Sequence, residues 1–422
     1  MLKQIVRVAP SSLNPPSRRN FTLNVIDGGV FALGMSLISH QTILPVFIKN
    51  IGGTNIAVGL IPVVWMLGFN FPQIFFAHMA QRVEYKKKLM LETGLIQRLP
   101  YLILAIVTFL VIADMSATPA LFIFFFMFTV AALGGSVHLP VWFDIISKIT
   151  PVTARGRLFA YRSIAGGILG VGGGWLAMVI LRTIAYPANF ALLFILAFGI
   201  MMISFYVLTR LQEENPTKPS STQHLLQNIR NIPAILKHEI NFRNFLIADA
   251  LVITASTANA FFTVHAFDTF RLDDSYAGLF TMVMMISTIL SSMLLGVIAD
   301  TFGHRLNLII AAIGTIIACA FALTAPNVYV YLIVFFISAF TINVVVISRL
   351  SIVVEMCTES ERPTFIALTN MLTSPFVLSG VAAGWVANEF GYDVVFFASG
   401  FCAIIAATWL AFKVREPRRF NR

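Results

Sequence analysis

The sequence is poor in charged residues and very poor in cysteine. Asp, Glu, Lys and Arg make up only 11% of the 422 residues, whereas a soluble domain typically holds about 25%. So few charges cannot cover a folded chain in water, which excludes an ordinary soluble enzyme, a disordered protein and a nucleic-acid-binding domain. The three cysteines, Cys319, Cys357 and Cys402, are scattered and odd in number. They predict neither a disulfide framework nor a metal site, and we expect no cofactor.

Long apolar stretches predict twelve transmembrane helices. Hydrophobic residues make up 58% of the chain, and the mean hydropathy is +0.85. About 20 apolar residues cross about 30 Å of hydrocarbon at 1.5 Å per residue. The first six predicted spans are 21–48, 56–80, 89–113, 119–147, 158–184 and 189–211. The second six are 243–270, 276–299, 307–325, 328–356, 363–389 and 392–413. We therefore expect an all-α polytopic membrane protein with an N-tail at 1–20, helix bundles at 21–211 and 243–413, a linker at 212–242 and a C-tail at 414–422.

Lys and Arg residues concentrate on one side of these predicted spans. That side holds both tails, the central linker and every second loop, whereas the other side holds only Lys49, Arg182 and Arg271. Because basic loops stay in the cytoplasm, we predict that both termini are cytoplasmic. Short outer loops favour a bacterial inner membrane. The net charge of +10 is explained by this bias and by anionic lipid headgroups, so we expect lipids rather than nucleic acid as partners, and a monomer.

Short sequence matches recur in the same order in the two halves of the chain. The triplet at 19–21 recurs at 243–245, the tetrapeptide at 57–60 resembles 276–279, and the glycine-rich stretch at 170–177 resembles 380–387. Each match alone is weak, but three in order around a central polar linker predict a duplication of six helices.

One predicted loop carries a recognisable pattern of glycine and charge. Gly296, Asp300, Gly303 and Arg305 follow the spacing G-x-x-x-D-x-x-G-x-R. This loop resembles the signature loop of the major facilitator superfamily, although Thr301 replaces an expected basic residue. The equivalent loop of the first half is degraded, and Gln81, Arg82 and Lys86 stand at its matching positions. The resemblance implies two pseudo-symmetric six-helix bundles and a loop that latches one state; alternatively, these residues merely cap helix ends.

Glycines also recur at four-residue spacing on two predicted helices. Gly166, Gly170 and Gly174 share one face of the fifth span, and Gly380 and Gly384 share one face of the eleventh. Small residues at this spacing allow helices to approach closely in lipid, so we predict helix packing between the halves.

Polar residues inside the spans are the candidates for function, because they are costly in lipid. The resemblance implies that helices 1, 4, 7 and 10 line a central cavity, and most of these residues fall there. The substrate-cavity candidates are Asn24, Phe31, His40, Gln41, His138, Trp142, Thr254, Thr257, Phe261, His265, Asn343 and Arg349.

Asp27 is the first candidate for a proton carrier, and Asp249 is the second. Asp27 stands alone in an apolar stretch, and a buried carboxyl can load and release a proton. The alternative is a fixed ion pair with Arg98 or Arg349. Arg349 in turn is a candidate for an anionic substrate group or for pairing with Asp27 or Glu355.

These features predict a secondary active transporter that moves a small molecule by alternating access and is coupled to protons. The many aromatic residues and few cavity cations favour export of an amphipathic or drug-like solute. The alternative is uptake or facilitated transport of a small polar metabolite. A membrane-embedded enzyme or a non-transporting sensor are remote alternatives, because we find neither a catalytic cluster nor an added cytoplasmic domain.

Overall fold

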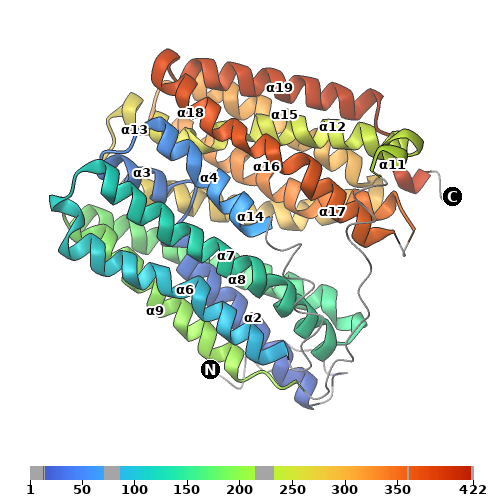
Figure 1. The fold of residues 1–422 in the computed structure, drawn as a ribbon, viewed down its shortest axis with the longest axis horizontal. Helices are drawn as coiled ribbons and strands as arrows, with labels where there is room; N and C mark the ends of the chain where they lie inside the picture. The colour runs from blue at the N-terminus through green and yellow to red at the C-terminus, as the bar shows by residue number, and fades with distance from the viewer. Residues whose placement is uncertain (1–12, 14, 71–85, 214–231, 359–360, 420–422) are drawn as a thin grey trace. The chain divides into compact units, whose positions relative to one another are not determined.

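The computed structural model describes residues 13, 15–70, 86–213, 232–358 and 361–419 (Figure 1). These residues are almost wholly helical and form no β-strand. Ten of their helices are long and apolar enough to cross a membrane. The prediction of an all-α polytopic membrane protein is therefore confirmed.

The chain divides into two compact units. The first comprises residues 1–47, 64–221 and 274–285, and the second comprises 48–63, 222–273 and 286–422. Residues 48–63 thus group with the second unit, and residues 274–285 group with the first. The helices that contain these segments, α4 (Asn55–Asn70) and α14 (Ser275–Phe302), contribute residues to both units.

The first unit packs its helices around a buried apolar cluster. In chain order they are α2 (Pro15–Ser36), α3 (Ile43–Asn50), which runs across the boundary at residue 47, α6 (Lys86–Leu110), the 3-10 helix η1 (Ile112–Asp114), α7 (Ala117–Ile149), α8 (Val152–Thr183) and α9 (Ala188–Thr209). Helix α2 contacts α8 and α9, and α6 contacts α7 and α9, as Figure 1 shows. Phe21, Trp142 and Leu158 lie in the shared core, while Phe122 is 71% exposed, as a lipid-facing side chain would be.

The second unit has the same kind of core. Its helices are α11 (Ile232–His238), α12 (Ile240–Ala255), η2 (Ser256–Ala260), α13 (Phe262–Phe270), α15 (His304–Thr324), α16 (Val328–Glu355), α17 (Arg362–Thr373), η3 (Ser374–Leu378), α18 (Ser379–Phe390), α19 (Tyr392–Phe412) and η4 (Pro417–Arg419). Helix α19 contacts α12 and α15, and α15 contacts α16. Phe242, Phe245 and Phe365 are among the buried core side chains.

Three predicted spans are interrupted rather than continuous. The first breaks between Ser36 and Ile43, the seventh at η2 and the eleventh at η3. Pro375 lacks the N–H that an α-helix needs at η3. Ser36 and Ser256 donate their hydroxyls to carbonyls three residues earlier, which competes with regular helix bonding. Hydropathy does not register such breaks.

Several boundaries also differ from the predicted ones. Helix α2 begins at Pro15, inside the expected tail, because proline suits the first turn of a helix. Helix α11 and the first residues of α12 fall within the expected linker. Helices α7 and α8 have 33 and 32 residues, longer than a membrane crossing requires.

Four of the five predicted packing glycines lie at close helix contacts within one unit. A Cβ on Gly174 would lie 2.8 Å from the Met282 nitrogen, and one on Gly170 would lie 2.8 Å from the Met285 sulfur. In the second unit, a Cβ on Gly380 would lie 2.7 Å from the Gly59 oxygen, and one on Gly384 would lie 2.6 Å from the Asn55 oxygen. Gly166 faces Ala32 of α2 less tightly, at 3.2 Å. Helix α8 thus meets α14, and α18 meets α4, at nearly backbone distance.

Candidate functional site

Asp27 lies at the centre of a buried polar cluster in the first unit. Its side chain is 3% exposed, and both of its carboxylate oxygens accept hydrogen bonds. Nη1 of Arg162 donates to Oδ2 at 2.6 Å, and the hydroxyl of Ser204 donates to Oδ1 at 2.6 Å. The carboxylate therefore joins α2 to both α8 and α9.

Arg162, and not Arg98 or Arg349, is the ion-pair partner of Asp27. Nη2 of Arg98 donates to the Ser204 hydroxyl at 3.4 Å, so Arg98 reaches the carboxylate only through that serine. The one feature of the sequence that is related to this pairing is the glycine that follows Asp27. A Cβ on Gly28 would lie 2.1 Å from Cγ of Arg162. Glycine at this position therefore makes the room in which the arginine lies.

Arg98 is the most deeply buried cation of the cluster, at 1% exposure. Its Nε donates to the Met201 carbonyl at 3.0 Å and its Nη1 to the Gly94 carbonyl at 2.7 Å. The Phe31 ring lies 5.3 Å from the guanidinium carbon. All three of its nitrogens are therefore held by protein atoms, and Ser204 links its charge to Asp27.

Three further candidates join the same cluster. The guanidinium carbon of Arg162 lies 4.5 Å from the centre of the Trp142 ring, and its Nη1 also donates to the Asn24 carbonyl at 2.8 Å. His138 hydrogen-bonds the Met90 carbonyl through Nδ1 at 2.9 Å, close enough to Asp27 and both arginines to feel their charges. Within the described ranges, the buried indole N–H of Trp142 and Oδ1 of Asn24 have no hydrogen-bond partner. The structure thus gathers Asn24, Asp27, Phe31, His138 and Trp142 around two arginines.

The second unit holds a separate carboxylate–arginine pair. Nε of Arg349 lies 2.9 Å from each oxygen of Asp249, whose side chain is 3% exposed. Nη1 donates to Asn370 at 3.0 Å, and Nη2 donates to Thr373 at 2.8 Å. Every nitrogen of Arg349 therefore has an acceptor from its own unit. Neither Asp27 nor Glu355, the two acids expected beside it, is its partner, because Asp249 lies directly opposite on α12.

The remaining candidates of the second unit are scattered over several contacts. Asn343 donates through Nδ2 to Ser291 at 2.8 Å and to Ser292 at 2.9 Å, which ties α16 to α14. His265 hydrogen-bonds the Tyr331 hydroxyl through Nδ1 at 3.0 Å. The hydroxyls of Thr257 and Ser379 share a hydrogen bond at 2.9 Å. Thr254 donates to the Ala250 carbonyl of its own helix, and Phe261 is fully buried.

His40 and Gln41 lie in the break between α2 and α3, apart from the Asp27 cluster. The His40 ring packs between Trp65 and Phe128, at centroid distances of 4.1 and 5.2 Å. Its Nε2 is buried and has no partner among the described residues. Gln41 is half-buried beside it in sequence.

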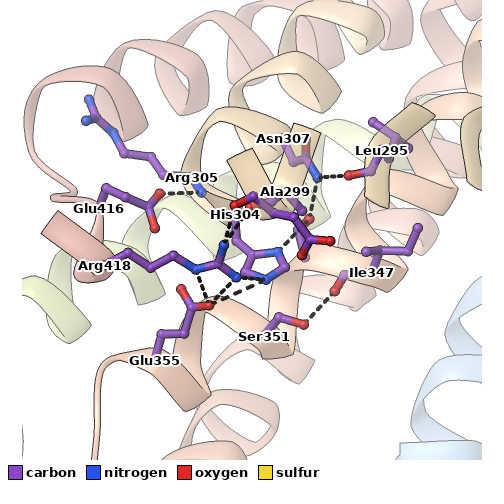
Figure 2. Close-up of polar contacts among 12 residues, drawn as sticks. Leu295, Ala299, His304, Arg305, Asn307, Ile347, Ser351, Glu355, Glu416 and Arg418 are labelled. Atoms are coloured by element: carbon purple, nitrogen blue, oxygen red, sulfur yellow. Dashed lines mark hydrogen bonds and ion pairs between the residues drawn. The ribbon is translucent and has the colours of Figure 1, made fainter. Parts of the chain in front are cut away.

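The signature loop is bound by the segment that follows the last helix (Figure 2). Glu416 accepts a hydrogen bond from the backbone N–H of Arg305 at 3.0 Å, so Glu416, not Asp300, caps the start of α15. Gly303 adopts a φ of 92°, and a Cβ there would lie 2.2 Å from the Glu416 carboxyl carbon. Both the backbone conformation and the close contact therefore require glycine at position 303. At Gly296, by contrast, an added Cβ would meet nothing within 4 Å.

Arg418 completes this contact, and Figure 2 shows it between Glu355 and His304. Its Nε donates to Glu355 at 2.7 Å, and its Nη1 donates to the carbonyls of Ala299 and Asp300 at 2.8 and 3.2 Å. Hydrogen bonding to Glu355 raises the pKa of Arg418 further above its ordinary value. The end of α14 is thus capped by an arginine of the C-terminal segment, which the sequence pattern did not reveal.

The first unit repeats this arrangement with its own glutamate. Glu213 follows α9 and accepts from the backbone N–H of Lys87 at 3.0 Å and from Nζ of Lys148 at 2.9 Å. Lys86 pairs with Asp144. Gln81 and Arg82, the other candidates of this loop, lie outside the described residues.

An asparagine pins the residue before each glutamate. Asn20 exchanges two hydrogen bonds with the backbone of Gln212, both at 3.1 Å. Asn241 exchanges two with the backbone of Arg415, at 3.0 and 2.7 Å. The two halves therefore share a contact that was not evident from the short sequence matches.

Over the described ranges, no three His, Cys, Asp or Glu residues lie close enough together to hold a metal ion. The Asp27 cluster is one of charge pairing, in which two arginines lie around a single carboxylate. A proton on the carboxylate would remove the charge that holds Arg162 and would leave two arginines without an acidic partner.

A family comparison matches nearly the whole chain. The family described as Major Facilitator Superfamily matches residues 27–268 and 245–422. A search of curated protein sequences found no significant relative.

Solved structures share the fold at low sequence identity. A mutant of the nucleoside transporter NupG is 11% identical with a TM-score of 0.73, covering 94% of this chain and 100% of that one. A D-xylose-proton symporter is 15% identical with a TM-score of 0.67, covering 95% and 98%. A mutant of the peptide transporter POT is 13% identical with a TM-score of 0.67, covering 96% and 97%. At these identities the likeness establishes the fold alone.

Proposed function

The chain belongs to the major facilitator superfamily, and on that premise we propose that it is a secondary active transporter that moves a small solute by alternating access and couples this movement to protons. The buried contact between Asp27 and Arg162 carries the proposal, because it joins helices through a bond that one proton can break. Asp249 is the second candidate for the coupling site.

Proton binding at Asp27 would act on three helices at once. The charged and titratable groups around its carboxylate are Arg162, Arg98 and His138. A neutral Asp27 would no longer attract Arg162, so α8 would be held less firmly against α2. Two protonation states would thus favour two helix arrangements, which is what coupling requires.

The direction of transport follows from how proton and solute influence each other. Export by exchange requires that they compete for one site, whereas symport requires that they bind together. Export of an amphipathic solute stays our prediction from composition, and proton-coupled uptake of a small polar metabolite stays the alternative. One of the three similar structures is a D-xylose-proton symporter, so this fold is compatible with coupling to protons.

The test begins with a thermal-stability screen of the purified full-length protein against sugars, organic acids, amino acids, nucleosides and lipophilic drugs. A solute that raises Tm binds the folded state. That solute is then followed in proteoliposomes that contain a pH dye. We expect solute-dependent proton flux, abolished in Asp27→Asn while exchange of labelled for unlabelled solute persists. Undiminished uphill transport by Asp27→Asn would contradict the role of Asp27.

We also propose that the signature loop is part of a state-dependent latch. The N–H of Arg305 is bound by Glu416, and the carbonyl of Asp300 is bound by Arg418, through contacts that can release when the loop moves. The distribution of Lys and Arg supports a bacterial inner membrane with both termini cytoplasmic. Reporter fusions at each end would test this orientation, since a periplasmic signal from either end would contradict it.

A further inference from the structure

The Asp27 cluster contains more positive than negative charge. Arg98 and Arg162 share one carboxylate, and among the described residues no second acid contacts either guanidinium. A buried charge without a partner is costly. In the second unit the corresponding balance is even, with Arg349 facing Asp249. The first unit is therefore the one in which an anion would be stabilised.

Of the two arginines, only Arg162 is free to accept an anion. Arg98 is 1% exposed, and all three of its nitrogens donate to protein oxygens. The Arg162 side chain is 20% exposed, and its two bonds within the described residues are both made by Nη1. Its Nε and Nη2 therefore make no hydrogen bond among the described residues. These two nitrogens form one edge of the guanidinium, and that edge matches the two oxygens of a carboxylate.

Trp142 adds a second and independent observation. Its side chain lies against the Arg162 guanidinium and is 5% exposed, and its indole N–H is buried with no acceptor among the described residues. A buried donor of this kind is normally satisfied, so it points to an acceptor that the protein does not supply. The rings of Phe143 and Phe159 lie 4.9 and 6.2 Å from that of Trp142. The surroundings of the arginine are therefore aromatic.

We propose that the open edge of Arg162, together with Trp142, binds the carboxylate of an organic anion that has an apolar or aromatic body, and that this anion is the transported solute. The inference rests on the proposed transporter function. It also sets the sign of the coupling. A proton on Asp27 would remove the negative charge that competes with the anion for Arg162, so proton and anion would favour each other's binding. This sign favours uptake by symport over the export that composition predicts.

The test uses the purified full-length protein and probes matched in shape but not in charge. Benzoate, phenylacetate, cinnamate and indole-3-acetate are compared with their primary amides, with acetate and with inorganic phosphate, by Tm and by tryptophan fluorescence. We expect at least one aromatic carboxylate to raise Tm while its amide does not. Equal shifts from acid and amide, or no shift from any carboxylate, would overturn the proposal. A shift from phosphate alone would also overturn it, since an oxyanion without a body would then suffice.

Variants locate the site. Arg162→Lys keeps the charge but loses the two parallel N–H groups that bind both carboxylate oxygens. We expect it to weaken carboxylate binding about tenfold or more. Trp142→Phe keeps an aromatic ring but removes the indole N–H. We expect a smaller loss of carboxylate affinity, about threefold to tenfold. Arg182→Gln, which changes an exposed arginine at the end of α8, is the folded control with unchanged binding. Unchanged affinity in both Arg162→Lys and Trp142→Phe would overturn the assignment even if a carboxylate binds elsewhere.

Flux measurements separate this inference from the proposed function. If a carboxylate binds through Arg162 but does not cross the proteoliposome membrane under any applied gradient, the binding site stands and the transporter function fails. If a neutral or cationic solute is transported and no carboxylate binds, the transporter function stands and the anion site fails.

Discussion

Both units bury a carboxylate against an arginine, but the two pairs differ in how completely they are satisfied. Arg349 places Nε on Asp249, Nη1 on Asn370 and Nη2 on Thr373. Arg162 uses Nη1 alone for Asp27 and a backbone carbonyl. Every nitrogen of Arg349 thus has an acceptor, whereas two nitrogens of Arg162 have none among the described residues. We therefore expect the pair in the second unit to contribute more to stability than the pair in the first.

Removing each arginine should expose this difference most strongly. Arg349→Gln leaves Asp249 buried without a counter-charge, which we expect to cost about 3–5 kcal/mol. Arg162→Gln should cost less, about 1–3 kcal/mol, because Asp27 keeps the Ser204 hydroxyl and the nearby charge of Arg98. Thermal unfolding of both variants in the same detergent measures the order. Equal losses of stability would mean that the two pairs are equivalent fasteners.

The glycine beside Asp27 offers a second way to break the comparison. A Cβ on Gly28 would overlap the Arg162 side chain, so Gly28→Ala should displace the arginine and cost about 1–3 kcal/mol. Gly172 lies on α8 with nothing within 4 Å of its added Cβ, so Gly172→Ala should be neutral or stabilise by up to about 1 kcal/mol. Tm values of the two variants test this. A Gly28→Ala protein as stable as Gly172→Ala would show that Arg162 has another resting place.

The glutamates that follow the last helix of each unit provide a smaller contrast. Glu213→Gln should cost about 1–2 kcal/mol, because it loses charge against both the Lys148 ammonium and the N-terminus of α6. Glu416→Gln should cost about 1 kcal/mol, because the hydrogen bond that Glu416 accepts among the described residues comes from the Arg305 N–H. The measurement is again Tm in detergent. A larger loss for Glu416→Gln would indicate that the C-terminal segment carries more than a cap.

The smallest expected effect is a pH dependence at the start of α17. The hydroxyl and N–H of Thr358 donate to Glu361 at 2.6 and 3.1 Å, and these hydrogen bonds lower the pKa of Glu361 below its ordinary value of 4.5. The folded state then binds the proton less tightly than the unfolded chain, so this stability is present above pH 4.5 and is lost as pH falls through the lowered pKa.

Thr358→Val should therefore have a slightly lower Tm than the wild type at pH 7, and the two should converge in acid. A difference that does not change with pH would assign the effect to packing. Helix α8, which follows Pro151 and has no side-chain cap, offers no such contact in the first unit.

Much of the fold was readable because hydrocarbon imposes a strong length and composition rule. Helices α9, α15, α16 and α19 begin and end within a few residues of the predicted spans. The breaks at 37–42, η2 and η3 were not predicted, because an apolar run has the same hydropathy whether or not its backbone is regular. Hydropathy also cannot see the exchange of 48–63 and 274–285 between the units, which is a matter of tertiary packing.

The sequence singled out some residues of the Asp27 cluster, but not Arg162 or Ser204, and not the contacts among them. Asp27, Asn24 and Trp142 were recognisable as polar or amphipathic groups inside spans. The Asp27–Arg162 contact joins residues 135 positions apart, and no helical periodicity relates them. Glu416 and Arg418 escaped notice because several of their partners are backbone groups, and because Arg418 and its side-chain partner Glu355 lie far apart in the sequence.

The hydrogen bonds that Glu213 and Glu416 accept also bear on how the protein is made. Glu213 can reach the start of α6 only after α9 has been synthesised, and the corresponding contact of the second unit waits for Glu416, which follows α19. Domains generally fold as units during synthesis, the N-terminal one first. The first contact can therefore form while most helices of the second unit are still to be translated, whereas the second can form only after α19 has been made.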